Sequence, residues 1–362
     1  PTDPTTPVDP TDPDTTAPAA PTITGASDDV GSIQGALSRG QSTDDTRPTF
    51  SGVAEAGAKV TIYDNGKAIG TVTAGSDGKW QFTPSSDLSE GAHSITSKAT
   101  DSAGNTGPAS PPFTVIIDTT PPATPGVLSA SDHTSSSAIP ILSGQYTHAG
   151  KPVLSGKGDP GDTITLYDKG VKIGETTVDA KGNWSFTPGK ALSEGAHSLT
   201  LTETDPAGNT SGMSKPLNFI IDTQPPATPV AQINGTGDQV TGTAEAGSIV
   251  TIKNSAGTVI GTTTADGTGH FTITLSPALI NGEKISVIAT DEAGNPSTPA
   301  NLNAPDTTPP AIPDGVAVSQ DGAHVTGTAE PGSTIIVKGE NGQQIGTGTS
   351  ETNGHCYVTI SP

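Results

Sequence analysis

The stretch KVTIYDNGKAIGTVTAGSDGKWQFT, residues 59–83, decides the fold class. Apolar and polar residues alternate in three short runs, at residues 59–63, 69–74 and 79–83. Such alternation is the pattern of β-strands with one buried face. Asp64-Asn65-Gly66 joins the first two runs as a hairpin signal, and Ser76-Asp77-Gly78 marks the next turn. Helical periodicity is missing throughout the chain, so we predict an all-β protein.

Further strands are expected on both sides of this stretch. Alternating runs bounded by Gly, Pro, Asn and Asp precede it at residues 21–24 and 48–53 and follow it at 93–100 and 113–117. Seven short strands in about 100 residues, with turn signals every 8–12 residues or so, are typical of an immunoglobulin-like sandwich. The chain lacks the Cys–Trp–Cys pattern of antibody domains, because it contains a single cysteine.

The same pattern recurs along the chain. Each copy opens with Asp-Thr-x-x-Pro, and the first three copies close with Thr-Asp-x-Ala-Gly-Asn. The opening aspartates lie 104, 104 and 84 residues apart, which suits a whole small domain and is too long for a solenoid unit. We therefore predict tandem immunoglobulin-like β-sandwich domains that form an elongated rod. The expected parts are a Pro-rich linker at 1–13, repeat 1 at 14–117, repeat 2 at 118–221, a shorter repeat 3 at 222–305 and a partial repeat 4 at 306–362.

The first two copies carry an insertion that the third lacks. Residues 25–47 of copy one and 129–151 of copy two have no full counterpart after Gln232. The difference falls between the first and second strands, which we call the A–B insertion. The fourth copy stops at Pro362, before the second half of the pattern, so we expect the chain to be part of a longer protein.

Composition excludes several classes of protein. The net charge is −21, from 37 acidic and 16 basic residues, so binding to nucleic acid or to an anionic membrane surface is not expected. No apolar stretch approaches the roughly 18 residues of a membrane helix, and we predict no membrane insertion. The acidic chain should repel its own copies and attract cations, which favours a monomeric rod. The single cysteine excludes an internal disulfide framework.

Repeated acidic residues predict calcium sites at the junctions between repeats. In a seven-strand sandwich the start of the first strand and the B–C and F–G turns lie at one end. Each of these places carries an acid, and few Lys or Arg residues lie close in sequence to pair with them. Ca²⁺ takes 6–8 oxygen ligands and tolerates irregular geometry better than Mg²⁺. The expected ligands are Asp14, Glu55, Asp101 and Asn105; Asp118, Asp159, Asp205 and Asn209; Asp222, Glu245, Asp291 and Asn295; and Asp306 and Glu330.

A second candidate site belongs to copy one alone. Asp28-Asp29 and Asp44-Asp45 flank its A–B insertion, and two adjacent acid pairs can bind another cation. Copy two has Asp132-His133 and Thr147-His148 there, which removes most of the carboxylates, and we predict no equivalent site in it. A solvated acidic loop is the alternative interpretation of the pairs in copy one.

Less specific interpretations compete with each of these features. Asp-Thr-x-x-Pro can simply initiate a turn, and Asp-x-Ala-Gly-Asn can stabilise a loop by hydrogen bonds from side chain to backbone. Trp80 and Trp184 occupy matching strand positions, where core packing is the simple explanation and a platform for stacking sugars is the alternative. The seven histidines are scattered, and we find neither a nucleophile elbow nor a phosphate-binding loop. We predict that the chain is not an enzyme.

The longest motifs resemble a known class of repeat. Thr43-Asp-Asp-Thr-Arg-Pro-Thr-Phe-Ser-Gly, Asp77-Gly-Lys-Trp-Gln-Phe-Thr and Ala99-Thr-Asp-Ser-Ala-Gly-Asn are similar to the bacterial Ig-like repeats of giant adhesins exported by type I secretion, of the kind found in Salmonella. The resemblance extends over residues 14–362. It implies Ca²⁺ at the junctions between domains, which stiffens a long rod, and attachment of bacteria to host cells or surfaces. Copy four departs from the pattern, because it ends before the F–G acid.

Three functions remain open at this point, of which the third is an enzyme-associated spacer that would need a catalytic domain elsewhere in the full protein. The first is a calcium-stiffened segment of a secreted adhesin at the bacterial cell surface, whose full-length protein attaches to a host cell-surface receptor such as a glycan. The second is a recognition module, in which the repeats themselves bind a glycan or protein through the A–B insertions and the two tryptophans.

Overall fold

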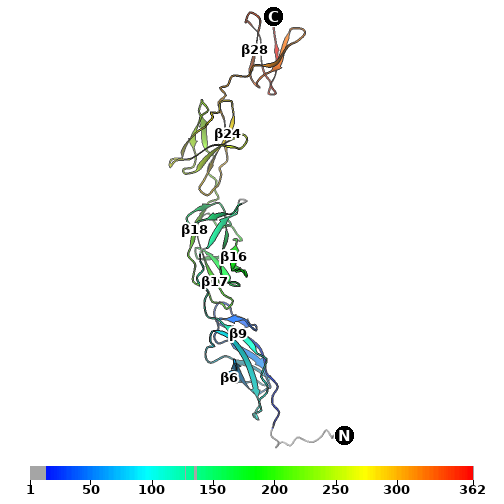
Figure 1. The fold of residues 1–362 in the computed structure, drawn as a ribbon, viewed down its shortest axis with the longest axis vertical. Coiled ribbons are helices and arrows are strands. Elements are labelled where there is room, and N and C mark those ends of the chain that lie inside the picture. Colours follow the sequence, from blue (N-terminus) through cyan, green and yellow to red (C-terminus); the bar gives the residue numbers. More distant parts are fainter. Residues whose placement is uncertain (1–13, 127, 134–136, 362) are drawn as a thin grey trace, which may run out of the picture. The chain divides into compact units, whose positions relative to one another are not determined.

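The computed structural model describes residues 14–126, 128–133 and 137–361 (Figure 1). The described residues form thirty β-strands and no helix. The chain divides into two compact units, Pro1–Gln224 and Pro225–Pro362. The Pro-rich linker predicted at 1–13 lies outside the described residues.

Repeat 1 is a sandwich of two sheets. Its strands are β1 (Thr22–Asp28), β2 (Gly35–Leu37), β3 (Ser42–Thr43), β4 (Thr49–Val53), β5 (Lys59–Asp64), β6 (Lys67–Thr73), β7 (Lys79–Phe82), β8 (Gly91–Thr100) and β9 (Phe113–Ile117). One sheet has the order β2-β1-β4-β7 and the other the order β3-β9-β8-β5-β6. The seven strands predicted from alternation are all present, which confirms the immunoglobulin-like class for this repeat.

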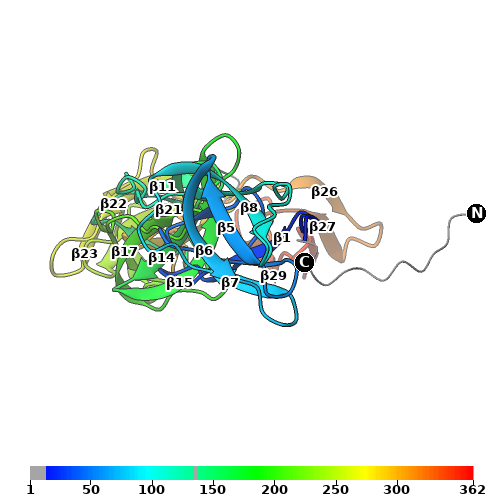
Figure 2. The same cartoon turned by 90° about the horizontal axis from the view of Figure 1, so that it is seen from below.

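The turn between β5 and β6 has the conformation that its sequence predicts. Asn65 and Gly66 have φ angles of 48° and 82°, the left-handed pair that a two-residue hairpin turn requires. Tyr63 pairs with Ala68 and Asp64 with Lys67, so the two strands run side by side (Figure 2). The strand β5 also pairs with β8 along its other edge.

The A–B insertion of repeat 1 contains two short strands that the sequence analysis did not predict. The strand β2 pairs antiparallel with β1, whereas β3 pairs parallel with β9 in the opposite sheet. The chain therefore crosses from one sheet to the other within the insertion. Strands of three and two residues are too short to show alternation, so no sequence pattern announces them.

Repeat 2 has the same plan. Its strands are β10 (Ser129–Asp132), β11 (Ile139–Ile141), β12 (Tyr146–Thr147), β13 (Val153–Lys157), β14 (Thr163–Asp168), β15 (Val171–Thr177), β16 (Asn183–Phe186), β17 (Gly195–Thr204) and β18 (Leu217–Ile221). The sheets have the orders β11-β10-β13-β16 and β12-β18-β17-β14-β15. The strand β12 again pairs parallel with the last strand, β18.

The second unit contains the shorter repeats. Its strands are β19 (Val230–Ile233), β20 (Gln239–Thr243), β21 (Ile249–Asn254), β22 (Val259–Thr264), β23 (His270–Thr274), β24 (Lys284–Thr290), β25 (Ala300–Asn303), β26 (Asp314–Val318), β27 (His324–Thr328), β28 (Thr334–Lys338), β29 (Gln344–Thr349) and β30 (His355–Thr359). Repeat 3 has sheets β19-β20-β23 and β22-β21-β24-β25. Repeat 4 has β26-β27-β30 and β28-β29.

Each of the first three repeats encloses its own thin apolar core. Alternate residues of both sheets supply it, as Val60 and Ile62 of β5 and Phe50 of β4 do in repeat 1. Trp80 and Trp184 belong to these cores and are 3% and 4% exposed. Core packing is therefore confirmed for both tryptophans. Indoles covered to this extent cannot offer an open face for stacking a sugar, which removes one basis of the recognition alternative.

Candidate metal centre

The opening aspartates initiate turns. In each copy the carboxylate Oδ1 accepts a hydrogen bond from the backbone N–H two residues later. The donors are Thr16 (2.9 Å), Thr120 (3.2 Å), Gln224 (3.0 Å) and Thr308 (3.3 Å). This is the side-chain-to-backbone chemistry expected of aspartate in a turn.

The acids of the F–G turns are held by the asparagine four residues later. Asp101 Oδ2 accepts from Asn105 Nδ2 at 2.8 Å, and the backbone N–H of Asn105 donates to Oδ1. The same pairs form between Asp205 and Asn209 and between Asp291 and Asn295. The hydrogen bonds from Asn105 lower the pKa of Asp101, so this carboxylate is ionised over a wide pH range.

The opening residue of a repeat lies against the F–G turn of the same repeat. Asn105 Nδ2 donates to the carbonyl oxygen of Asp14, and Asn209 Nδ2 to that of Asp118, both at 2.8 Å. The backbone N–H of Asp118 donates to the carbonyl of Thr43 in repeat 1 at 3.0 Å. Asp118 is therefore hydrogen-bonded to both repeats of the first unit.

The A–B insertion of repeat 1 reaches the F–G turn of repeat 2. Ser32 Oγ donates to the carbonyl oxygen of Gly208 at 2.8 Å. The backbone N–H of Asp44 donates to the carbonyl oxygen of Ala207 at 3.3 Å. The second site predicted for copy one and the junction site predicted for copy two thus adjoin each other within the first unit.

The acid pairs of the insertion are partly buried and only partly satisfied. Asp28 Oδ2 accepts from Thr43 Oγ1 at 2.6 Å, whereas Asp44 Oδ1 and Asp45 Oδ2 are buried without a hydrogen-bond partner. Burial, and then the charge of Asp28, raises the pKa of Asp44, and Asp205 of repeat 2 contributes to the same effect. Burial also raises the pKa of Asp45, with Asp28 and Asp29 contributing.

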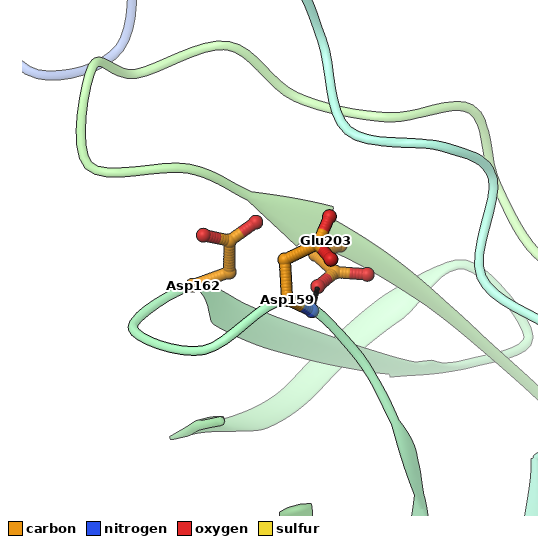
Figure 3. A group of neighbouring side chains, drawn as sticks. All are labelled: Asp159, Asp162 and Glu203. Carbon is orange, nitrogen blue, oxygen red and sulfur yellow. Dashed lines mark hydrogen bonds between the residues drawn. The ribbon is translucent and has the colours of Figure 1, made fainter. Parts of the chain in front are cut away.

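A compact group of three carboxylates lies at the same end of repeat 2. Asp159, Asp162 and Glu203 each place one oxygen within 4.8 Å of the others, which no other set of His, Cys, Asp or Glu side chains does among the described residues (Figure 3). Glu203 Oε1 accepts from the backbone N–H of Asp159 at 2.6 Å. Asp162 is 4% exposed, and its Oδ2 has no hydrogen-bond partner.

The pKa values of Asp162 and Glu203 are raised because both carboxylates are buried and lie close to the carboxylate of Asp159. Burial, followed by the carboxylates of Glu203 and Asp159, raises the pKa of Asp162 to about 6. Asp205 and Asp118 contribute to the same shift, so the B–C turn, the F–G turn and the opening residue share one acidic environment. Burial also raises the pKa of Glu203.

Within each unit, the structure does not bring the other predicted ligands together as compact groups among the described residues. Glu55 and Glu245 are exposed in their B–C turns. Asp222 belongs to the first unit and its predicted partners Glu245, Asp291 and Asn295 to the second, so that set stays a prediction. Asp306 accepts hydrogen bonds from Thr308 and belongs to an isolated bridge with Asn281, and its grouping with Glu330 also stays a prediction.

The residues at the end of repeat 2 suit a hard divalent cation. Carboxylate and carbonyl oxygens are the ligands of Ca²⁺, and buried carboxylates normally have hydrogen-bond or ionic partners. Asp44, Asp45 and Asp162 each retain a buried oxygen that lacks such a partner. A cation would supply it, and the donor set around Asp159 therefore fits calcium.

Asp162 and Glu203 are absent from the ligands proposed from sequence. An alignment of the copies shows that these two acids are unusual, because repeat 1 has Ala58 and Ala99 at the equivalent positions. The two acids occur in one copy only, so the motifs that the copies share do not include them.

Comparison with known families decides what kind of repeat this is. Residues 17–119 and 124–223 match the family described as bacterial Ig-like domain, and residues 225–306 and 309–362 match that described as bacterial Ig domain. The chain belongs to the bacterial Ig-like domain family. Among the described residues of these Ig-like repeats there is no helix of the length and apolarity needed to cross a membrane.

The Ig-like repeats are also similar to parts of larger curated proteins. Exoglucanase B of Cellulomonas fimi is 29% identical over 221 residues, which is 59% of this chain and 18% of that protein. Bacillopeptidase F of Bacillus subtilis is 30% identical over 157 residues, or 42% of this chain and 10% of that protein. The chain thus spans less than a fifth of either relative, and Ig-like repeats of this kind are usually non-catalytic.

Solved structures resemble the repeats at low identity. The fibronectin(III)-like modules of Clostridium thermocellum CbhA share 15% identity over 51% of this chain and 90% of theirs, with a TM-score of 0.32. A tetra-tandem repeat from the extending region of a large adhesion protein shares 20% identity over 95% of this chain and 91% of that one, with a TM-score of 0.26. Scores this low support no statement about function.

Proposed function

We propose that the chain is a calcium-stiffened segment of a secreted bacterial adhesin, in which Ig-like repeats space a binding tip from the cell surface. The observation that carries the proposal is the meeting of acidic side chains at the junction of repeats 1 and 2. Asp44 and Asp45 of repeat 1 lie there with Asp118, the opening residue of repeat 2, and Asp205, in its F–G turn. One buried oxygen of Asp44 and one of Asp45 have no hydrogen-bond partner.

The junction is where a cation would have the largest mechanical effect. The linker between the two repeats is a short run that begins at Asp118 and continues through threonine and proline, and proline restricts only its own φ angle. Without a cation, the carboxylates on either side repel each other across the junction. With calcium bound, the same carboxylates would attract a common ion, and the angle between the repeats would be held.

Calcium suits a protein that is exported and then works outside the cell. Extracellular calcium modules bind with affinities on the order of 10⁻⁴ to 10⁻³ M. Sites of that strength would be empty in the cytoplasm and filled outside. The chain would be slack during export, with type I secretion as the expected route, and stiff at the surface, where the complete protein would attach to a host receptor such as a glycan.

Small-angle scattering of the chain with Ca²⁺ and then with chelator tests the proposal. We expect a long, fixed maximum dimension with calcium and a broader, shorter distribution after chelation. Calorimetry on the same sample measures the uptake of the ion. An unchanged dimension together with no uptake of Ca²⁺ would contradict the proposal and leave the acids as turn-forming residues only.

A pair of variants shows whether the junction carboxylates are responsible. Asp44→Asn combined with Asp45→Asn removes two charges at the junction of repeats 1 and 2. Asp77→Asn combined with Asp179→Asn removes two charges from exposed turns of the same repeats and serves as the matched control. We expect the first variant to need more calcium to reach its full length, and the second to respond as the parent does.

A further inference from the structure

Three positions around the B–C turn distinguish repeat 2 from the other repeats. In repeat 2 they are occupied by Gly158, Asp162 and Glu203. The equivalent residues are Ala54, Ala58 and Ala99 in repeat 1, and Ala244, Ser248 and Ala289 in repeat 3. Two acids and a glycine therefore stand where the other repeats have small, neutral residues.

These are core positions. Ala58 and Ala99 are 2% and 0% exposed, and Asp162 and Glu203 are each 4% exposed. Two carboxylates in place of two methyl groups carry a substantial desolvation cost, because a buried charge requires a partner. Within the residues described, none of the ion pairs with lysine, arginine or histidine includes Asp159, Asp162 or Glu203.

The glycine accommodates the glutamate. A Cβ atom at Gly158 would lie 2.4 Å from Glu203 Oε1 and 3.0 Å from its Cδ. The alanine found in the other repeats therefore could not remain without displacing the carboxylate. The three changes are complementary: the glutamate fills the space that the missing methyl group leaves, and its Oε1 accepts from the N–H of the next residue, Asp159.

Hydrogen bonding within the protein leaves this group incomplete. Glu203 has a backbone donor, but Asp162 Oδ2 is buried with no partner while one oxygen of each carboxylate lies within 4.8 Å of the others. Figure 3 shows the three carboxylates converging from the turn between β13 and β14 and from the end of β17. Three hard oxygen donors that meet beside an unsatisfied buried oxygen can supply part of the shell of 6–8 oxygens that Ca²⁺ takes.

We propose that Asp159, Asp162 and Glu203 form a calcium site that repeat 2 has and the other repeats lack. The site adds to the calcium of the proposed function, with which it shares Asp159, but it lies within one repeat. Its ligands come from the B–C turn and from β17, so the ion would fix that turn to the core strand. The surface of repeat 2 that faces the A–B insertion of repeat 1 would then be rigid before the junction forms.

Calcium titration of the full chain against one variant tests the site. The variant Gly158→Ala/Asp162→Ala/Val178→Ala/Glu203→Ala places the residues of repeat 1 in repeat 2, because a Cβ at Gly158 would also lie 2.9 Å from Val178 Cγ2, where repeat 1 has Ala74. The folded core of repeat 1 shows that this combination packs. We expect calorimetry to find one Ca²⁺ fewer per chain in the variant than in the parent. A second variant, Asp162→Asn/Glu203→Gln, keeps the shape of both side chains and should lose the same ion.

Matched controls identify what each outcome means. Asp179→Asn, in an exposed turn of repeat 2, should retain the full number of calcium ions. Both site variants binding as many ions as the parent would overturn the inference, and the carboxylates would then share a proton. The proposed function is separate: it fails if the parent takes up calcium without any change in its scattering dimension, even where the site variants lose their ion.

Discussion

Asp162 illustrates how far a single residue can depart from the pattern of its repeat. Its pKa is raised to about 6, because burial and the carboxylates of Glu203, Asp159, Asp205 and Asp118 all disfavour its charged form. The folded state therefore binds this proton more tightly than the unfolded chain, whose aspartates titrate near 3.8. By linkage, the contribution of Asp162 to the free energy of unfolding is largest below about pH 4 and falls as the pH rises towards 6.

This linkage predicts a pH dependence for repeat 2 in calcium-free solution. The melting temperature should fall between pH 4 and pH 6, and the variant Asp162→Ala/Glu203→Ala should not show that fall. Fluorescence of Trp184 in a Trp80→Phe background reports on repeat 2, since these are the only tryptophans and repeat 3 carries Phe271 at the matching position. A parent protein whose melting temperature rises over this window would contradict the assignment.

A second residue-scale prediction concerns a buried histidine. His197 is 3% exposed, with Nδ1 2.7 Å from Asp168 Oδ2 and Nε2 2.8 Å from the carbonyl oxygen of Ser193. Asp168 Oδ1 also accepts from the backbone N–H of Ser198. Asp168→Ala should lower the free energy of unfolding of repeat 2 by about 1–3 kcal/mol, because buried donors lose their acceptor.

Urea unfolding measures this effect, with Asp179→Ala as the control. Asp179 accepts hydrogen bonds from the backbone of an exposed turn, where water can replace a lost carboxylate, so its loss should cost less. Equal losses for the two variants would mean that the buried contact adds nothing. Alternation and turn signals did not predict this contact, because the histidine and the aspartate are 29 residues apart. The pair recurs in repeat 1, where His93 Nδ1 lies 2.8 Å from Asp64 Oδ2.

At the scale of elements, alternation and turn chemistry predicted most strands. The short strands of the A–B insertion were found only in the structure. The strands β4 to β9 were predicted because each is long enough to alternate and is bounded by Gly, Pro, Asn or Asp. The strands β2 and β3 were missed because they are too short to alternate, and β3 also depends on pairing with the distant strand β9. Core packing, the simple explanation for the two tryptophans, was confirmed, since both lie in the cores.

We expect the side chain of Thr43 to hold the A–B insertion in place. Its hydroxyl donates to Asp28 Oδ2 at 2.6 Å and accepts from the backbone N–H of Asp45 at 3.1 Å. Thr43→Val keeps the shape but removes both bonds, and it should cost about 1–3 kcal/mol. Hydrogen exchange at Asp44 and Asp45 should become faster.

The matched control for Thr43→Val is Thr49→Val. Thr49 exchanges a hydrogen bond with Thr83 at an exposed position, at 2.7 Å, so its replacement should leave exchange in the insertion unchanged. Unaltered exchange at Asp44 in the Thr43 variant would show that the insertion is held by its backbone pairs alone.

At the scale of the whole molecule, the charge of −21 makes the response to cations a test of mechanism. Sodium screens repulsion, with a Debye length of about 8 Å at 0.15 M, but it cannot join carboxylates. Magnesium requires a more regular shell and gives up water reluctantly. The scattering dimension should therefore recover fully with calcium, weakly with magnesium and least with sodium at equal ionic strength. Equal recovery with all three would indicate screening alone.

The period of the sequence predicted a series of small domains, and the resemblance of their motifs implied the bacterial Ig-like class. The contacts between the first two repeats came only from the structure. Ser32 and Asp44 meet the F–G turn of repeat 2 through backbone carbonyls, which carry no side-chain signature. Acids that recur in every copy were found from sequence, whereas Asp162 and Glu203 occur once and were not. The division into repeats at the predicted boundaries stays a prediction.

The parallel pairing of β3 with β9 has a consequence for a repeat under tension. Ser42 pairs with Ile116 and Thr43 with Ile117, and the N–H of Asp118, where the chain leaves the repeat, donates to Thr43. Pulling on the end of the repeat loads these bonds together, in shear, and they must break at once; an antiparallel hairpin pulled from its open end would unzip bond by bond. Repeat 2 pairs β12 with β18 in the same way. In repeat 3 the last strand, β25, pairs with β24 and with no other strand of the described residues, so a force that pulls on the chain should stretch repeat 3 before repeats 1 and 2.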